Sequence, residues 1–278
     1  MKVTYAMLKA PGLYQNELLS VLLTEISDRI AADLKLVDLP VGAIVYEAGI
    51  AERYAYFPGD ALISLLPVIE NGKSTEVAVV GNEGMVGIDT LTGGSNPCSQ
   101  AVVQCAGAAY RVPTQLLREE FKRHSEMRWL LLRYIQSLFA QISQAAVCNR
   151  HHSVEQQFCR KLLTSADRLS ADEIALTQEK IAELLGVRRE GVTAAAGQLR
   201  KLGVIDYRRG HIRILDREKL EELSCECYAV VKTECDRLRP SEFRKSTLNV
   251  VPRFAAHRPA IPVAGRRNGF GSSSAYVS

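Results

Sequence analysis

The stretch that decides the fold is residues 177–215, TQEKIAELLGVRREGVTAAAGQLRKLGVIDYRRGHIRIL. Thr177 is a good helix N-cap, and apolar residues follow it at helical spacing as far as Gly186. Glycine accepts the left-handed conformation that ends many helices, so a turn is expected there. A second amphipathic helix begins near Arg188 and stops at Gly203. The spacing predicts a helix-turn-helix.

A basic hairpin is predicted directly after these helices. Apolar residues alternate on both sides of Arg209-Gly210, which is typical of two short strands joined by a two-residue turn. A hairpin in this position is a wing, and wings contact the sugar-phosphate backbone of DNA.

Charged side chains lie where docking in a DNA major groove requires them. The second helix of a helix-turn-helix presents its N-terminal residues to the base edges. Arginine binds both acceptors of guanine, and glutamate accepts from the amino group of cytosine. We therefore predict double-stranded DNA as the partner, with contacts from Thr177, Gln178, Arg188, Arg189, Glu190, Thr193, Arg200, Arg208, Arg209 and His211. The alternative is an amphipathic helix pair with a solvated basic face.

The composition fits two modest globular domains. The chain has 278 residues, 47% hydrophobic and 24% charged, without an apolar run long enough to cross a bilayer. The start of the sequence lacks the layout of a secretory signal, and seven scattered cysteines do not form a disulfide framework. We expect a cytoplasmic protein that does not contact a membrane. No P-loop, metal-ligand cluster or nucleophile–base motif indicates an enzyme.

The net charge of +4 is unevenly distributed. From Pro240 onward there are six Lys or Arg residues and one acid, a charge of +5, so the preceding residues sum to −1. Positive charge in the predicted folded part is concentrated at 188–213. This favours a site-specific DNA-binding protein over a protein that covers DNA without sequence preference. The stretch 240–278 is rich in Pro, Gly, Ser and Arg and is predicted to be a disordered basic tail.

The N-terminal half changes from helical to strand texture. Residues 1–37 have helical periodicity, whereas 37–113 contain short apolar runs broken by glycine and proline, with a strong hairpin turn at Asn71-Gly72. This predicts a β-roll, and an α+β fold for the chain. A short polar helix is expected at 114–124.

A long helix is predicted from Glu126 to Arg150. Its apolar residues step alternately by four and three, the spacing of a heptad seam. We predict that this seam forms the dimer interface, and the alternative is packing within its own domain. The seam residues are Leu131, Ile135, Leu138, Ile142 and Ala145.

Further helices are expected after this long helix. Ser153 and Gln156 form a possible capping box at the start of a helix that reaches about Ser165. The segment 216–238 also has a helical pattern.

This order of parts resembles the Crp/Fnr family of bacterial transcription regulators over residues 20–238. The most specific match is GVRREGVT, 186–193. The resemblance implies that Arg189 and Glu190 read base pairs. The family often has an arginine where this chain has Ala194, so a different operator sequence is expected. The implied domains are a β-roll sensor at 1–125, a dimerisation helix and hinge at 126–152, and a winged helix-turn-helix at 153–239.

The sensor domain departs from family members that bind cyclic nucleotides. Those members use a Gly-Glu pair for the ribose and an arginine for the phosphate. Here the first pair is Gly87-Ile88, the second falls near Cys98 and Ser99, and Lys73 is the only basic residue between Gly72 and Tyr110. We predict no cofactor and argue against cyclic AMP. These four residues mark a degenerate effector pocket, and an unknown small-molecule effector stays open.

Cysteine and histidine positions leave alternatives open. Oxygen-sensing relatives group their cluster cysteines near the N-terminus, but the first cysteine here is Cys98. Cys225, Cys227 and Cys235 match no strong metal pattern and are interpreted as structural, with metal or redox roles as alternatives. His151-His152 is interpreted as a surface or capping pair, with a pH or metal switch as the alternative.

Together these features predict a homodimeric regulator that reads a two-fold-symmetric operator, and whose DNA affinity is modulated through the β-roll. RNA polymerase is an expected further partner. The rival function is a ligand-responsive signalling module whose winged helix binds protein.

Overall fold

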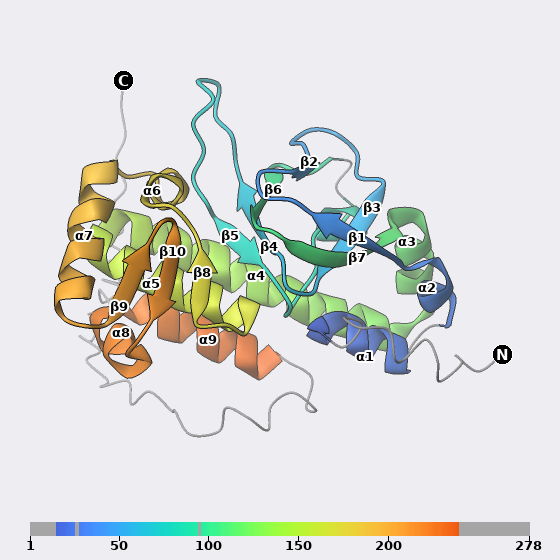
Figure 1. Ribbon diagram of the computed structural model, residues 1–278. Coiled ribbons are helices and arrows are strands. Elements are labelled where there is room, and N and C mark those ends of the chain that lie inside the picture. The colour runs from blue at the N-terminus through green and yellow to red at the C-terminus, as the bar shows by residue number, and fades with distance from the viewer. Residues whose placement is uncertain (1–14, 26–27, 94–95, 239–278) are drawn as a thin grey trace, which may run out of the picture. The chain divides into compact units, whose positions relative to one another are not determined.

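Two antiparallel sheets form the N-terminal half of the chain in the computed structural model (Figure 1). The structure describes residues 15–25, 28–93 and 96–238. One sheet has the order β1-β7-β3, with β1 (Lys35–Leu39), β7 (Gly107–Pro113) and β3 (Tyr54–Pro58). The other has the order β2-β6-β4-β5, with β2 (Ile44–Tyr46), β6 (Gln100–Cys105), β4 (Leu62–Leu66) and β5 (Ala78–Val80). The predicted β-roll and the α+β fold are confirmed.

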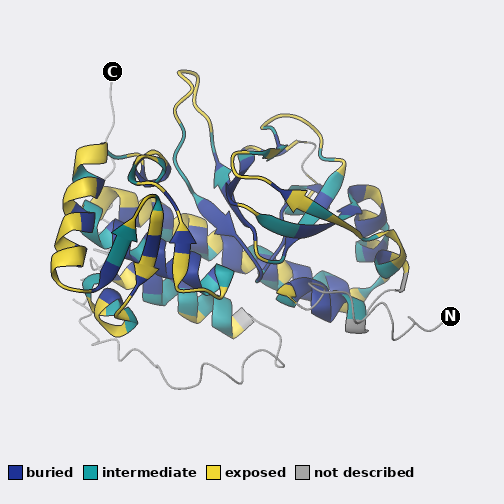
Figure 2. Cartoon of the chain, in the orientation of Figure 1, coloured by how far each residue is buried: buried dark blue, intermediate teal, exposed yellow. Residues whose placement is uncertain are grey.

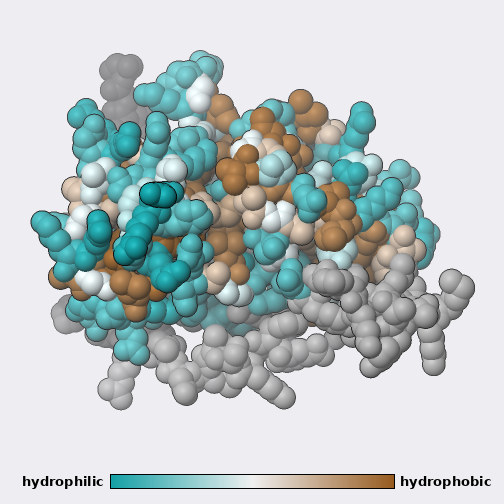
Figure 3. Space-filling model, in the orientation of Figure 1, coloured by the Kyte–Doolittle hydropathy of each residue, from teal (hydrophilic) through white to brown (hydrophobic). Residues whose placement is uncertain are grey.

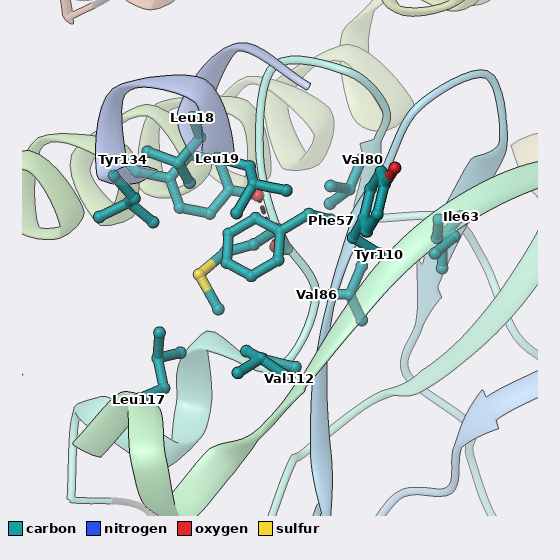
Figure 4. Close-up of a cluster of buried hydrophobic side chains, with 14 of the residues drawn as sticks. Leu18, Leu19, Phe57, Ile63, Val80, Val86, Tyr110, Val112, Leu117 and Tyr134 are labelled. Carbon is teal, nitrogen blue, oxygen red and sulfur yellow. Dashed lines mark hydrogen bonds between the residues drawn. The ribbon is translucent and has the colours of Figure 1, made fainter. Parts of the chain in front are cut away.

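Helices close this roll. They are α1 (Glu17–Glu25), α2 (Asp28–Asp33), the short 3-10 helix η3 (Ile88–Leu91), α3 (Thr114–Arg123) and the first half of α4 (Ser125–His151). Their apolar side chains share one core with the strands, and Figure 4 shows Leu19, Phe57, Val112 and Tyr134 converging in it. The helical region predicted for 1–37 ends earlier, because β1 already starts at Lys35.

Tyr134 of α4 contacts the roll beside Gly84, a position that requires glycine. Its hydroxyl donates a hydrogen bond of 2.8 Å to the backbone oxygen of Met85. A Cβ atom at Gly84 would lie 2.2 Å from the Tyr134 ring, so a larger residue there would displace the ring.

The C-terminal half begins with the predicted capping box. Ser153 Oγ accepts from Gln156 N, and Gln156 Oε1 accepts from Ser153 N, which satisfies the start of α5. The elements that follow are α5 (Val154–Leu169), β8 (Glu173–Ala175), α6 (Gln178–Leu185), α7 (Arg189–Lys201), β9 (Ile205–Arg208), β10 (His211–Ile214), α8 (Arg217–Leu223) and α9 (Glu226–Leu238).

Two features of this half differ from the sequence prediction. The wing sheet has a third strand, β8, in the order β8-β10-β9. Three residues are too few to show an alternating pattern, so this strand gave no signal. The predicted segment 216–238 is two helices, separated at Ser224 and Cys225, and the second of them packs along α4 (Figure 1).

Buried ion pairs join the roll to α5. Lys161 Nζ lies 2.6 Å from Glu76 Oε2 and 2.7 Å from Gln104 Oε1, and Arg168 Nε lies 2.6 Å from Glu83 Oε1. Apolar residues of the roll share a core with α5, namely Leu62, Val79 and Cys105 with Phe158 and Leu162. The roll therefore contacts the helix-turn-helix region through both charge and apolar packing.

Some predictions lie outside the described residues. They concern the helical pattern of 1–14 and the basic tail at 240–278. Within the described residues, no helix is long and apolar enough to span a membrane.

Candidate nucleic-acid interface

The two helices of the predicted motif are capped as the sequence requires. Thr177 Oγ1 accepts a hydrogen bond of 3.2 Å from Lys180 N at the start of α6. Gly186 ends α6 with φ of 67°, the left-handed conformation expected of a helix C-cap. Arg188 is the N-cap residue of α7, so Arg189 and Glu190 open that helix.

The inner face of α7 is buried. Val192, Ala195 and Leu199 are at most 4% exposed, and they share a core with α5 and α6. Burial of this face fixes which side chains of α7 point outward.

The outer face of α7 carries the predicted base-reading residues. Arg188, Arg189, Glu190, Thr193 and Arg200 are all exposed, and Figure 2 shows this face of α7 largely in yellow. Among the described residues, no ion pair involves Arg188, Arg189 or Arg200. Their donors are therefore available to a ligand.

One outward side chain was not among the predicted contacts. Gln198 is exposed on the face that carries Ala194 and Gly197, and a Cβ atom at Gly197 would meet nothing within 4 Å. Gln198 follows Ala194 by four residues, a spacing that could have identified it. Glutamine can bind both hydrogen-bonding groups of adenine, so Gln198 joins the candidate residues.

Gln178 and Thr193 contact each other directly. Thr193 Oγ1 donates a hydrogen bond of 2.8 Å to Gln178 Oε1. This bond joins the first turn of α6 to the outer face of α7, so the two side chains orient the recognition helix as well as lying at its surface.

The wing carries charges that are partly paired. Arg208 contacts Asp206 at 2.9 Å, while Glu173 of β8 contacts both His211 and Arg213, at 3.2 Å and 2.8 Å. Glu173 was not recognised from the sequence, because β8 was not predicted.

Arg209 occupies the tip of the hairpin. The φ angles of Arg209 and Gly210 are 49° and 84°, as a type I′ turn requires. Hydrophilic residues, in teal, cover much of the surface over α7 and this hairpin (Figure 3).

Acidic side chains lie beside the residues of the predicted effector pocket. Gly87 precedes η3 with φ of 99°, Ile88 packs against the core, Ser99 is buried and Cys98 is exposed. Nearby, burial and the charge of Asp89 raise the pKa of Glu52 to about 7, against the lowering effect of Arg118.

Both carboxylate oxygens of Glu52 are buried without a hydrogen-bond partner among the described residues. A cyclic phosphate needs positive charge at its site. The carboxyl groups of Glu52 and Asp89 cannot supply it.

The predicted dimer seam is divided by the fold. Leu131, Leu138 and Ala145 are buried in their own chain, at 0%, 7% and 2% exposure, whereas Ile135 is half-buried and Ile142 is exposed. Leu131 and Leu138 belong to the core of the roll, so their side chains are covered within their own chain. The heptad spacing identified an apolar helix, but the five seam residues include buried, half-buried and exposed side chains.

Outward-facing apolar residues of α4 form a second stripe, which shares Ile142 with the predicted seam and is displaced from it by roughly a quarter of a turn. The exposed members are Trp129, Leu132, Phe139, Ile142 and Val147. We call these five residues the α4 stripe.

Comparison with known proteins identifies the domain that carries this interface. Residues 156–223 match the model of the Crp-like helix-turn-helix domain. This part of the chain is a Crp-like helix-turn-helix domain. The resemblance stated from the sequence is thereby confirmed for this domain. Among curated proteins, no sequence matches this chain.

Solved structures share the fold over most of the chain. FixK2 from Bradyrhizobium japonicum is similar with a TM-score of 0.61 at 16% identity, covering 69% of this chain and 98% of that one. A protein assigned to the Crp/Fnr family from Eubacterium rectale gives 0.58 at 16% identity, with coverages of 73% and 96%. A CooA variant from Carboxydothermus hydrogenoformans gives 0.56 at 13% identity, with coverages of 76% and 96%.

Proposed function

We propose that two copies of this chain bind a two-fold-symmetric operator, with one α7 in each of two successive major grooves. The observation that carries the proposal is the start of α7, where Arg189 and Glu190 are exposed while the opposite helix face is buried. Side chains at this position of a helix-turn-helix meet base edges. The predicted contacts Thr177, Gln178, Arg188 and Thr193 surround them.

The wing supplies the backbone contacts in this proposal. Arg209 at the hairpin tip, with Arg208 and His211 beside it, lies where a phosphate strand would follow the groove. Arg200 stands at the other end of α7.

The α4 stripe supports the dimer. Five exposed large apolar side chains on one helix form a patch of the kind that marks a protein interface. Two-fold pairing of this helix would bring two recognition helices together, as helix-turn-helix dimers require.

Modulation through the roll is supported by a direct contact with the helix-turn-helix. The loop between β4 and β5 donates a backbone hydrogen bond of 2.8 Å from Glu76 N to Leu184 O, near the end of α6. A ligand that binds the roll changes DNA affinity only if it favours one arrangement of this contact over another. A cytoplasmic location and contact with RNA polymerase accompany this function as predictions.

Arg189→Ala tests the base-reading assignment. Duplexes that bind the wild type are first selected from a random pool, and each base pair of the selected site is then varied. The variant should lose about 1–3 kcal/mol of binding free energy and relax its preference at one base pair in each half-site. Arg123→Ala, an exposed arginine of α3, is the matched control and should change neither quantity. An Arg189→Ala variant with an unchanged base preference would remove this residue from the readout.

The rival signalling module makes a different prediction about salt. If α7 and the wing contact phosphates, the logarithm of DNA affinity falls linearly with the logarithm of salt concentration. A winged helix that binds only protein shows no salt-dependent affinity for duplex DNA.

A further inference from the structure

Four potential metal ligands converge where α4 meets α5. Cys148 and His152 lie four residues apart at the end of α4, and Cys225 and Cys227 lie at the start of α9. The sulfur atoms of Cys148 and Cys225 are 3.5 Å apart, and Cys227 Sγ is 3.5 Å from His152 Nδ1. All four ligand atoms lie within 4.8 Å of one another. The cluster joins two segments about 75 residues apart in the sequence.

These distances suit one tetrahedral ion. Bonds of about 2.3 Å to thiolates and slightly shorter bonds to imidazole place neighbouring ligand atoms about 3.8 Å apart around a tetrahedral centre. Small shifts of side chains already this close would complete such a shell. A Cys₃His set is one of the common structural zinc sites.

The general tendency of cysteine to be buried does not explain why these four side chains lie together. Cys159 is fully buried among apolar residues of the helix-turn-helix core, and Cys105 Sγ lies 3.7 Å from the backbone oxygen of Ala175. Neither of these two thiols belongs to the group of potential metal ligands. In contrast, Cys148, Cys225 and Cys227 form a buried cluster of their own, at 0%, 4% and 1% exposure.

The histidine is already oriented as a ligand. His152 turns Nδ1 toward Cys227, while Nε2 lies 3.3 Å from Glu226 Oε1. Gln157 Nε2 donates a hydrogen bond of 3.0 Å to the backbone oxygen of His152. A carboxylate on the second ring nitrogen is the usual support of a metal-bound histidine, because it fixes the tautomer and the ring plane.

We propose that Cys148, His152, Cys225 and Cys227 bind one divalent transition metal ion of the zinc class. On binding, the three thiols lose their protons, and the ion and its ligands together carry a charge of −1. Arg160 of α5, which interacts electrostatically with Cys148, offsets that charge.

The ion fastens the end of α4 to the start of α9. Without it, the side-chain contacts between these segments at this point are Cys148 with Cys225, and His152 with Cys227 and Glu226. The site lies at the joint between the long helix and the helix-turn-helix domain, so metal occupancy holds that joint in one arrangement. This last consequence concerns the proposed function, whereas metal binding itself does not depend on DNA binding.

Cobalt binding to the full-length chain tests the proposal. The purified protein is reduced, stripped with a chelator under anaerobic conditions and titrated with Co²⁺, and zinc content is measured in the protein as expressed. We expect the chain to bind one equivalent of Co²⁺, with thiolate-to-cobalt charge-transfer absorption and the visible bands of a tetrahedral ion. Zn²⁺ should displace the cobalt and abolish both kinds of absorption. Cys227→Ser should reduce the charge-transfer absorption by about a third, because one of three sulfur ligands is gone. Cys98→Ser, at an exposed cysteine outside the cluster, should leave the spectrum unchanged.

Glu226→Gln extends the test to a variant that folds normally, because this side chain is 67% exposed. Loss of the carboxylate should weaken Zn²⁺ binding about tenfold while the cobalt spectrum keeps its shape. The proposal is overturned if the reduced wild type gives no thiolate-to-cobalt absorption. It is also overturned if Cys98→Ser abolishes that absorption, or if the reduced, stripped chain re-forms only a Cys148–Cys225 disulfide and binds no metal.

Discussion

The helix-turn-helix and the β-roll belong to one chain but depend on their sequences in different ways. In the helix-turn-helix, caps, turn and recognition face are each specified within a few residues, and Thr177 and Gly186 act as their types predict. In the roll, the strand pattern specifies the fold, but the buried Glu52 and Asp89 come together beside Gly87 only through contacts between distant segments. Local signals therefore define the helix-turn-helix, whereas the surroundings of a residue in the roll depend on which side chains the sheets bring together.

Breaking the contact between these two regions should have the largest effect. Lys161→Met leaves Glu76 and Gln104 buried beside an apolar side chain, so the free energy of unfolding should fall by about 3–5 kcal/mol. Urea denaturation measures this quantity.

The double variant Lys161→Met/Glu76→Leu is the control for that prediction. Because both charges are then absent, part of the lost stability should return. If the single and double variants are equally stable, Lys161 and Glu76 do not act as a pair.

Substitutions in the α4 stripe should have the next largest effect. Phe139→Glu with Ile142→Glu should produce monomers in sedimentation, since buried interface anchors contribute about 2 kcal/mol or more each. Leu36→Glu changes another exposed apolar residue, on β1, and should leave the dimer intact. Leu138 is unsuitable for this test because it is buried in its own chain. A Phe139/Ile142 variant that stays dimeric would place the interface elsewhere.

The sequence predicted the bounds of α4 but not which of its faces is buried. Apolar spacing located the helix to within a residue at each end, from 126–150 to Ser125–His151. It did not predict that the roll and α9 cover the side containing Leu131 and Leu138, because those contacts come from residues far away in the sequence.

The cysteine cluster illustrates the same limit. Cys225 and Cys227 were noticed together with Cys235, but their neighbours in space are Cys148 and His152. Helical spacing places Cys148 and His152 on one face of α4. Only the return of α9 along α4 brings the other two ligands to them.

A substitution in the wing should have a smaller effect. Arg209→Asn keeps a residue type that tolerates positive φ, so the hairpin should stay folded. Loss of one phosphate contact should weaken binding to all duplexes alike and reduce the salt slope by about one. A change in base preference instead would mean that the wing reads sequence.

The last prediction concerns Glu52, beside the predicted effector residues of the roll. The pKa of Glu52 in the folded chain is about 7, above its usual value of 4.5, because burial and then Asp89 disfavour its charged form. The folded state therefore holds this proton more tightly than the unfolded state. Its contribution to stability is present below about pH 4.5 and is lost as the pH rises through about 7.

Glu52→Gln removes this titration. The decrease in the free energy of unfolding between pH 4.5 and 7 should be smaller in this variant than in the wild type. Denaturation at a series of pH values measures the difference. Parallel curves would show that Glu52 titrates in the folded chain as it does in water.

Selection of bound duplexes from a random pool by the wild-type protein tests the central claim most directly. We predict enrichment of two inverted half-sites whose centres lie about one helical turn apart, because two α7 helices related by two-fold symmetry enter successive major grooves. Enrichment of a single unrepeated motif, or no enrichment at all, would contradict the dimeric reading of an operator.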